Sequence, residues 1–145
     1  MKIIENKEYI AIRKKFIDAF LNYSNDLLKE NYYKNNILNT VDGLFHSGYF
    51  WDVLNNPKII KEDEAIKFLC NNSKNFYILW DNNIYVIREV KKYPIFSALK
   101  TNIKEFRDIK NQLPLDIYVF DVDFNWLIAF THENIEEDRY CLFVR

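Results

Sequence analysis

The sequence predicts an α+β fold: a single globular domain over residues 1–145, built on a mainly antiparallel sheet of about five or six strands. Apolar residues recur at helical spacing in three segments, which predicts a long N-terminal helix and two further helices packed on the sheet. Runs of β-branched and aromatic residues between turn residues predict the strands. A chain of 145 residues with 49% hydrophobic content, no linker-like segment and no repeat has the size of one domain.

The N-terminal segment from Lys7 to Lys29 is expected to form one long amphipathic helix. Its apolar residues recur at spacings of three and four, which places them on one helical face. They are Tyr9, Ile12, Phe16, Phe20, Tyr23 and Leu27. The polar segment that follows contains a turn at Asp42–Gly43, and the next apolar run, Tyr49 to Leu54, is expected to be a short strand.

Two more helices are predicted by their own N-terminal signals. The acidic run Glu62–Glu64 opens the segment Lys61 to Asn72, where negative charge complements the unpaired amides of a helix N-terminus. Between Pro94 and Pro114, apolar residues share one helical face, and Asn102 followed by Glu105 resembles a capping box. The apolar residues of that face are Leu99, Ile103, Phe106 and Ile109.

The remaining apolar runs are expected to be strands. Phe76–Asp81 and Ile84–Glu89 flank a polar turn as a hairpin would, and the first of them is apolar on both faces, as in a central strand. The C-terminal third contains strands at Leu115–Asp121, Asn125–Thr131 and Arg139–Val144, with "HENIEED" as a polar loop. The two-residue period of a strand places Trp126, Ile128 and Phe130 on one buried face.

The composition argues against nucleic-acid binding, lipid binding and membrane insertion. With 20 basic and 21 acidic residues, the formal charge of -1 creates no field that would gather nucleic acid or anionic lipid. Cys70 and Cys141 stand in hydrophobic surroundings and are expected to be buried, unbridged thiols, which indicates a reducing, cytoplasmic setting. The use of Asn, Lys, Ile and Tyr indicates an AT-rich, bacterial gene. Charges interrupt every apolar run that could be a signal peptide or a membrane span.

His132 and Glu133, which end the stretch "FDVDFNWLIAFTHE", are the first candidates for chemistry. A histidine titrates near neutral pH, and a glutamate is a general base or a metal ligand. Adjacent strand residues point to opposite faces, however, which favours a structural role. We therefore expect the His132 ring to hydrogen-bond to backbone or a nearby carboxylate, and Glu133 to face away from it.

Three other residues are candidate members of a site. His46, the only other histidine, could join His132 and a carboxylate from Asp121, Asp123 or Glu133 in a metal or catalytic site. Nothing in the spacing requires this, and a partly buried imidazole bonded to backbone explains His46 as well. Asp121 and Asp123 are expected to serve a turn, since "DVDFN" lacks the glycine and distal glutamate of a calcium loop. The sequence thus predicts no metal and no cofactor.

Four aromatic residues are candidates for a binding surface. They are Tyr32, Tyr33, Tyr49 and Trp51. Exposed Tyr and Trp supply contact energy at low entropic cost, and Tyr32–Tyr33 stands in a polar segment. A core position is the alternative for each of them.

The C-terminal motif "LDIYVFDVDFNWLIAFTHE", Leu115 to Glu133, resembles a bacterial family of small uncharacterised proteins, the domain-of-unknown-function family 4275. Upstream, "YFWDVLNN" and "EDEAIKFL" are similar to the aromatic strand and the following helix of that family. The resemblance spans residues 43–145 and implies a fold, because the family has no assigned activity. The residues that match the family's C-terminal pattern are Phe124, Trp126, Thr131, His132 and Glu133.

The function that the sequence favours is protein–protein binding by a small cytoplasmic bacterial protein, of the antitoxin or immunity type, with a toxin as the partner. The alternative is a hydrolase or metal-dependent enzyme that uses His132, Glu133 and His46. An enzyme needs these groups to converge in a cleft, whereas a binding protein needs an exposed patch.

Overall fold

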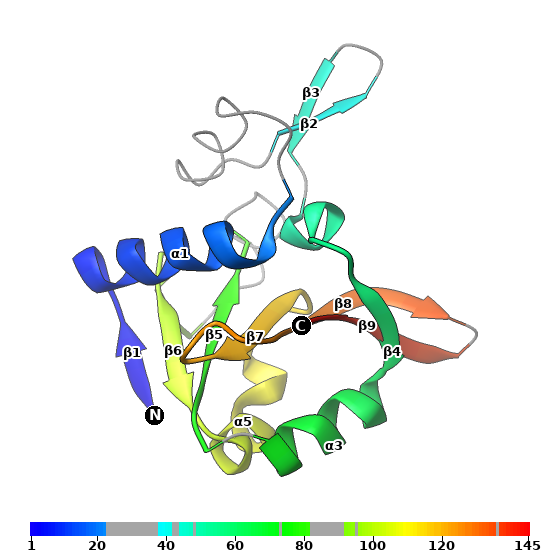
Figure 1. The fold of residues 1–145 in the computed structure, drawn as a ribbon. Coiled ribbons are helices and arrows are strands. Elements are labelled where there is room, and N and C mark those ends of the chain that lie inside the picture. Colours follow the sequence, from blue (N-terminus) through cyan, green and yellow to red (C-terminus); the bar gives the residue numbers. More distant parts are fainter. Residues whose placement is uncertain are drawn as a thin grey trace.

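The computed structural model describes residues 1–22, 38–41, 44–47, 49–72, 74–81, 92–94, 96–135 and 137–145, and of residues 38–41, 44–47 and 135 the backbone alone. Its main feature is a seven-stranded antiparallel sheet with strand order β1-β6-β5-β7-β8-β9-β4 (Figure 1). A separate two-stranded sheet pairs β2 with β3. The strands are β1 (Lys2–Ile4), β2 (Leu38–Val41), β3 (Leu44–Ser47), β4 (Lys58–Lys61), β5 (Phe76–Trp80), β6 (Ala98–Thr101), β7 (Ile117–Asp121), β8 (Leu127–Ile135) and β9 (Asp138–Val144).

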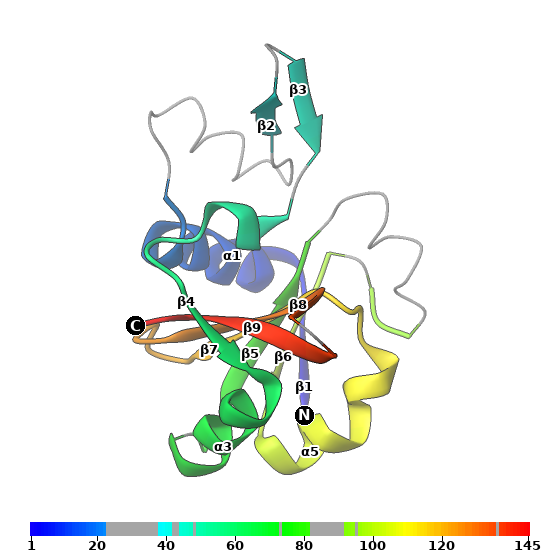
Figure 2. The same cartoon turned by 90° about the vertical axis from the view of Figure 1, so that its right-hand side faces the viewer.

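Helices cover both faces of the seven-stranded sheet. In two perpendicular views, α1 lies on one face and α3 and α5 lie on the other (Figures 1 and 2). The α-helices are α1 (Asn6–Phe20), α3 (Glu62–Asn72) and α5 (Ile103–Ile109), and two 3₁₀ helices, η1 (Phe50–Val53) and η2 (Lys110–Gln112), complete the described elements. The α+β class is thus confirmed, whereas the sheet has more strands than the five or six expected.

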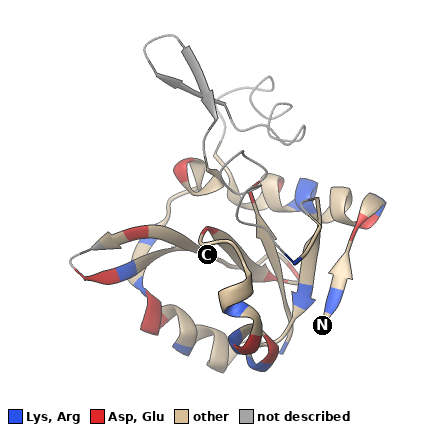
Figure 3. Ribbon diagram, turned by 180° about the vertical axis from the view of Figure 1, so that it is seen from behind, with Lys and Arg blue, Asp and Glu red and all other residues tan. Residues whose placement is uncertain are grey.

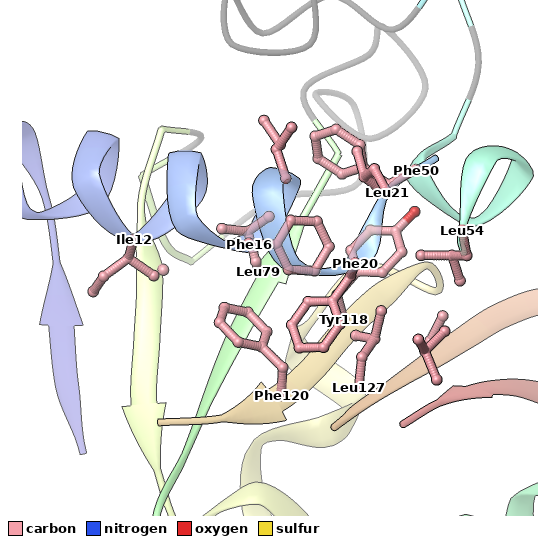
Figure 4. Close-up of a cluster of buried hydrophobic side chains, with 14 of the residues drawn as sticks. Ile12, Phe16, Phe20, Leu21, Phe50, Leu54, Leu79, Tyr118, Phe120 and Leu127 are labelled. Atoms are coloured by element: carbon pink, nitrogen blue, oxygen red, sulfur yellow. The ribbon is translucent and has the colours of Figure 1, made fainter. Parts of the chain in front are cut away.

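The core on the α1 face is built from aromatic rings (Figure 4). Phe16 of α1 is fully buried, and its ring centroid lies 5.0 to 5.6 Å from those of four other rings. Those rings belong to Phe20, Phe50, Tyr118 and Phe120, so one side chain joins α1, η1 and β7. Aromatic pairs at such tilted or edge-on geometry add to the stabilisation from area burial.

The core on the opposite face joins the sheet to α3 and α5. Leu69 of α3 and Phe106 of α5 are fully buried there. Trp126, Ile128 and Phe130 lie in this same core, which confirms the predicted register of β8. The sheet is therefore buried on both faces, as its apolar central strands require.

The strand β5 is an interior strand of the sheet, next to the central strand β7, as its apolar residues predicted. It pairs with β6 on one side and with β7 on the other. The second arm of the predicted hairpin, Ile84–Glu89, lies outside the described residues. The first arm is a strand as expected.

The two later helices follow their local signals. The predicted helix Lys61–Asn72 is α3, which begins with its three acidic residues. In α5 the side chain of Asn102 accepts a hydrogen bond from the backbone N–H of Glu105 at 3.0 Å, the capping contact that the sequence predicted. Leu99, however, belongs to β6 and not to this helix.

The first helix is shorter than the predicted Lys7–Lys29, because α1 ends at Phe20. Leu21 is extended and forms an isolated antiparallel bridge with Leu54. On either side of it, the N–H of Asn22 donates to Val53 and the N–H of Asn55 donates to Phe20, at 2.7 and 2.8 Å. The helix thus ends at Phe20 because Val53 and Asn55, which are distant in sequence, supply hydrogen-bond partners for the backbone of Phe20 and Asn22. Tyr23 and Leu27 lie outside the described residues.

The predicted strand Tyr49–Leu54 is wrong, since Phe50–Val53 form the 3₁₀ helix η1. The backbone N–H groups of Phe50 and Trp51 donate to the side chains of Asp81 and Tyr118, at 2.8 and 3.0 Å. Those donors are therefore unable to join a strand ladder. The partners come from β7 and from the residue after β5, which no local pattern reveals.

The predicted loop "HENIEED" is also wrong, because β8 continues through it to Ile135. Asn134 pairs with Arg139 and Ile135 with Asp138 beyond a register shift that starts after Phe130. A bulge of this kind lets a strand continue past residues that do not alternate in the ordinary way. The polar residues of this segment predicted a loop. Beyond Phe130, however, β8 pairs with β9 and no longer with β7, and this extension of the hairpin tolerates polar side chains.

Both cysteines are unbridged, as expected, but only one is buried. Cys141 lies in the core of the α3 face, and burial raises the pKa of its thiol to about 12. Cys70 is exposed on α3, where Arg107 donates to its sulfur at 3.2 Å. Among the described residues, no helix is long and apolar enough to cross a membrane.

Substituting Phe16 by Ala should lower the free energy of unfolding by about 3–5 kcal/mol, because it empties the centre of the aromatic core. The matched control is Ile10→Ala, on the same helix but 64% exposed, which should change stability by less than about 0.5 kcal/mol. Urea denaturation of both variants measures the difference. Equal losses for the two would contradict the role assigned to Phe16.

Candidate functional site

Two buried aspartates meet where β5 ends and β7 begins. Trp80, the last residue of β5, pairs with Ile117, the first residue of β7, so Asp81 and Asp116 lie next to each other just beyond this pair. Asp81 is 0% exposed and Asp116 is 3% exposed. Alternation along the strands places both side chains on the α1 face, together with Tyr118. Buried carboxylates require hydrogen-bond donors, and the chain around them provides several.

Asp81 is held by η1 and β7. The backbone N–H of Phe50 donates to Oδ1 at 2.8 Å, and the hydroxyl of Tyr118 donates to Oδ2 at 2.6 Å. Burial raises the pKa of Asp81 to about 7, although these two donors and the charge of Arg13 favour the ionised form. The neighbouring charge of Asp116 raises it as well. The group therefore changes its protonation near neutral pH.

Asp116 binds a tryptophan and a histidine at once. Its Oδ1 accepts from Trp51 Nε1 and from the backbone N–H of His132, each at 3.0 Å. The ring Nδ1 of His132 lies 2.9 Å from Oδ2. Since a carboxylate only accepts hydrogen bonds, Nδ1 carries a hydrogen and donates it, which leaves Nε2 as the outward atom. The expected bond from this ring to a carboxylate is confirmed.

The rings above Asp116 form a surface that we call the aromatic ledge: Tyr49, Trp51 and His132. Tyr49 and Trp51 are stacked, with centroids 5.4 Å apart and planes at 17°. The His132 ring contacts both, at centroid distances of 5.3 and 5.8 Å. Tyr49 and Trp51 are half-buried, and the His132 side chain is 35% exposed. Two of the predicted binding residues, Tyr49 and Trp51, thus lie together with His132, the first candidate for chemistry, for which a structural role was expected.

The expectation that Glu133 faces away from His132 is wrong. Glu133 Oε1 lies 3.4 Å from His132 Nε2. The register shift after Phe130 removes the ordinary alternation, and the hydroxyl of Thr131 accepts the N–H of Glu133 at 3.3 Å. Consecutive residues can therefore turn toward one another, and the imidazole lies between two carboxylates.

The other candidates do not join this cluster. Asp121 accepts from the backbone N–H and the side-chain amide of Asn125, at 3.2 and 2.9 Å, and so serves the turn before β8 as expected. His46 stands in β3, opposite Asn39, and its side chain is not described. Tyr32 and Tyr33 lie outside the described residues. Within the described part of the chain, no three His, Cys, Asp or Glu side chains are placed to hold a metal ion.

Sequence reasoning missed Asp81, Asp116 and Tyr118 as members of the site. The local pattern places Asp81 at the end of the predicted strand Phe76–Asp81 and the other two within the predicted strand Leu115–Asp121, and it gives none of them a role in a site. A signal does exist: Asp116 and Tyr118 are polar residues two apart in the apolar run "LDIYVF", so they share one face of a buried strand. A buried aspartate in such a run needs a partner, but the partner cannot be identified from local sequence.

A cleft of about 660 Å³ lies elsewhere, between α3 and the β8–β9 hairpin. It contains none of the residues of the aromatic ledge, and its charges are of both signs. The residues that line it are Lys61, Glu62, Asp63, Ile66, Lys67, Asn134, Glu137, Asp138 and Arg139.

Comparison with known proteins gives no further assignment: no protein-family model, no curated protein and no solved structure matches this chain. The resemblance to the domain-of-unknown-function family 4275 stays a prediction.

Stability should fall as the pH rises from about 4 to about 7, in so far as Asp81 controls it. The pKa of Asp81 in the folded chain, about 7, lies above its ordinary value of 3.8, so the folded chain binds this proton more tightly than the unfolded chain does. Asp81 therefore contributes on the order of 4 kcal/mol to the free energy of unfolding below pH 4, and this contribution is lost as the pH approaches 7. Asp81→Asn cannot titrate and should lack this fall. Urea denaturation of both proteins across this range tests it, and a pH-independent difference between them would contradict it.

Substituting His132 by Ala should lower the free energy of unfolding by about 1–3 kcal/mol, because buried Asp116 loses its ring donor. Glu133→Ala is the control: its side chain is 48% exposed, and the change should stay within about 0.5 kcal/mol. Thermal and urea denaturation measure both. A His132→Ala variant as stable as the unsubstituted chain would show that the ring does not support the fold.

Proposed function

We propose that this chain acts by binding another protein through the aromatic ledge, as an antitoxin or immunity protein binds its toxin in a bacterial cytoplasm. The observation that carries the proposal is the convergence of Tyr49, Trp51 and His132 over one buried carboxylate. The unbridged thiols of Cys70 and Cys141 agree with a reducing compartment.

The ledge has the physical properties of an interface hot spot. Tyr and Trp are enriched at such positions, because they offer large contact areas and lose little side-chain entropy on binding. Here Asp116 holds the indole of Trp51 and the imidazole of His132 before any partner arrives. Rings that are already ordered lower the entropic cost of association. A partner that covers the ledge would therefore gain most of its contact energy from three side chains.

The test is affinity capture from the native cell with the unsubstituted chain, with Tyr49→Ala and with Ile10→Ala. We expect one protein to be captured by the first and the last, and at least about tenfold less of it by Tyr49→Ala, as the loss of a hot-spot ring predicts. Ile10 is the control because it is an exposed apolar residue on the solvent side of α1. Thermal melting of each variant verifies folding. Equal capture by all three would refute binding through the ledge.

One observation favours a second function, general acid–base catalysis. His132 Nδ1 is fixed by Asp116, and Nε2 lies 3.4 Å from Glu133 Oε1, so an oriented imidazole stands beside a second carboxylate. A hydrolase of this kind would turn over a simple activated ester or phosphodiester, and His132→Gln would abolish that turnover without unfolding the chain. Turnover that survives this substitution, or none at all with the unsubstituted chain, favours the binding function.

A further inference from the structure

The aromatic ledge is bordered by negative charge from two elements. Glu133 of β8 reaches the edge of the His132 ring, and Asp52 of η1 directly follows Trp51 and accepts the backbone N–H of Tyr49 at 3.1 Å. Both carboxylates act on Tyr140 of β9: burial raises the pKa of its phenol, and the charges of Glu133 and Asp52 raise it further. Carboxylates from η1 and β8 therefore lie toward the same region of the surface.

Three described basic side chains near the ledge, those of Arg13, Arg139 and Lys61, already have other partners. Arg13 is 3% exposed and lies over the Phe50 ring, inside the core. Arg139 lies over the Phe130 ring, on the α3 face of the sheet, and donates to the carbonyls of Thr131 and Leu115. Lys61, which is opposite Tyr140 in the β4–β9 ladder, pairs with Asp138 at 3.3 Å. Over the described chain as a whole, by contrast, charges of both signs are interspersed (Figure 3).

Electron-rich rings beside carboxylates attract cations. The faces of Trp and Tyr bind a guanidinium or ammonium group within about 6 Å of the ring centroid. A guanidinium is planar, so it can stack on a ring and also donate two hydrogen bonds to a carboxylate at its edge. The same carboxylates repel phosphate. Stacking of nucleic-acid bases on Tyr49 and Trp51 would bring phosphates toward Glu133, so the charge of the site disfavours that ligand.

We propose that the aromatic ledge receives an arginine side chain of a basic partner protein, with the guanidinium stacked on the Tyr49–Trp51 pair and paired with Glu133. This inference rests on the proposed binding function and adds the chemistry of the partner. It assigns Glu133 as the residue that selects a cationic group.

The test is an NMR titration of the isotope-labelled full chain with the blocked peptide Gly-Arg-Gly. The indole N–H signal of Trp51 is the readout, since Trp80 and Trp126 are buried. We expect the peptide to shift this signal saturably, and raised salt to weaken the binding. The same peptide with citrulline in place of arginine, which has the shape without the charge, should bind at least about tenfold more weakly.

Two matched variants assign the charge to its residue. Glu133→Gln should weaken binding of the arginine peptide by about tenfold, the effect of losing one partly desolvated ion pair. Glu137→Gln removes another exposed carboxylate, from the β8–β9 turn, and should leave the affinity unchanged. Adenosine monophosphate serves as the anionic probe and should not shift the Trp51 signal.

The inference is overturned by equal binding of the arginine and citrulline peptides, by no binding of either, by a Glu133→Gln variant that binds normally, or by a shift with adenosine monophosphate alone. Its failure is distinguishable from failure of the proposed function. If Tyr49→Ala loses the captured partner but Glu133→Gln retains it, the proposed protein binding is supported and the arginine inference is wrong. If Tyr49→Ala captures the partner as well as the unsubstituted chain does, the proposed binding through the ledge is wrong.

Discussion

Two carboxylates buried side by side determine how η1 packs on the end of the sheet formed by β5, β7 and β8. Asp81 and Asp116 lie next to each other where β5 ends and β7 begins, and neither is more than 3% exposed. Burial of a carboxylate costs free energy unless donors surround it. Five hydrogen bonds from η1, β7 and β8 meet that requirement, and they come from Phe50, Trp51, Tyr118 and His132. These bonds fix the position of η1 over the end of the sheet.

The aromatic core and the carboxylate pair depend on each other. Phe50 donates its backbone N–H to Asp81 and packs its ring against Phe16 of α1, with centroids 5.4 Å apart. Tyr118 contributes its ring to the same core and its hydroxyl to Asp81. The polar contacts select one placement of η1, and the rings contribute the apolar burial that stabilises it. A change in the charge of Asp81 is therefore felt in the core as well as at the ledge.

The aromatic ledge combines a buried carboxylate that orients its rings with partly exposed ring edges. Asp116 accepts hydrogen bonds from the indole of Trp51 and the imidazole of His132, which holds both rings in their orientation, while Glu133 lies beside the outer nitrogen of His132. The bulge in β8 makes this possible, because regular alternation would send His132 and Glu133 to opposite faces. The site thus uses an irregularity of the strand, as bulges near functional surfaces often do.

The sequence by itself determined the features whose causes are local. Helical spacing and the cap of Asn102 specified α3 and α5, and the two-residue period specified the buried face of Trp126, Ile128 and Phe130. Each depends on residues within one or two turns or along one strand. The tertiary structure alone decided the end of α1, the 3₁₀ helix in place of a strand, and the approach of Glu133 to His132. In the first two cases, backbone groups are satisfied by residues far away in the chain, such as Asn55 for Phe20 and Asp81 for Phe50. In the third, the register shift in the pairing of β8 with β9 turns two neighbouring side chains toward one another. Local propensity is worth only tenths of a kcal/mol per residue, whereas a buried group without its partner costs about 1–3 kcal/mol, so the distant contacts prevail.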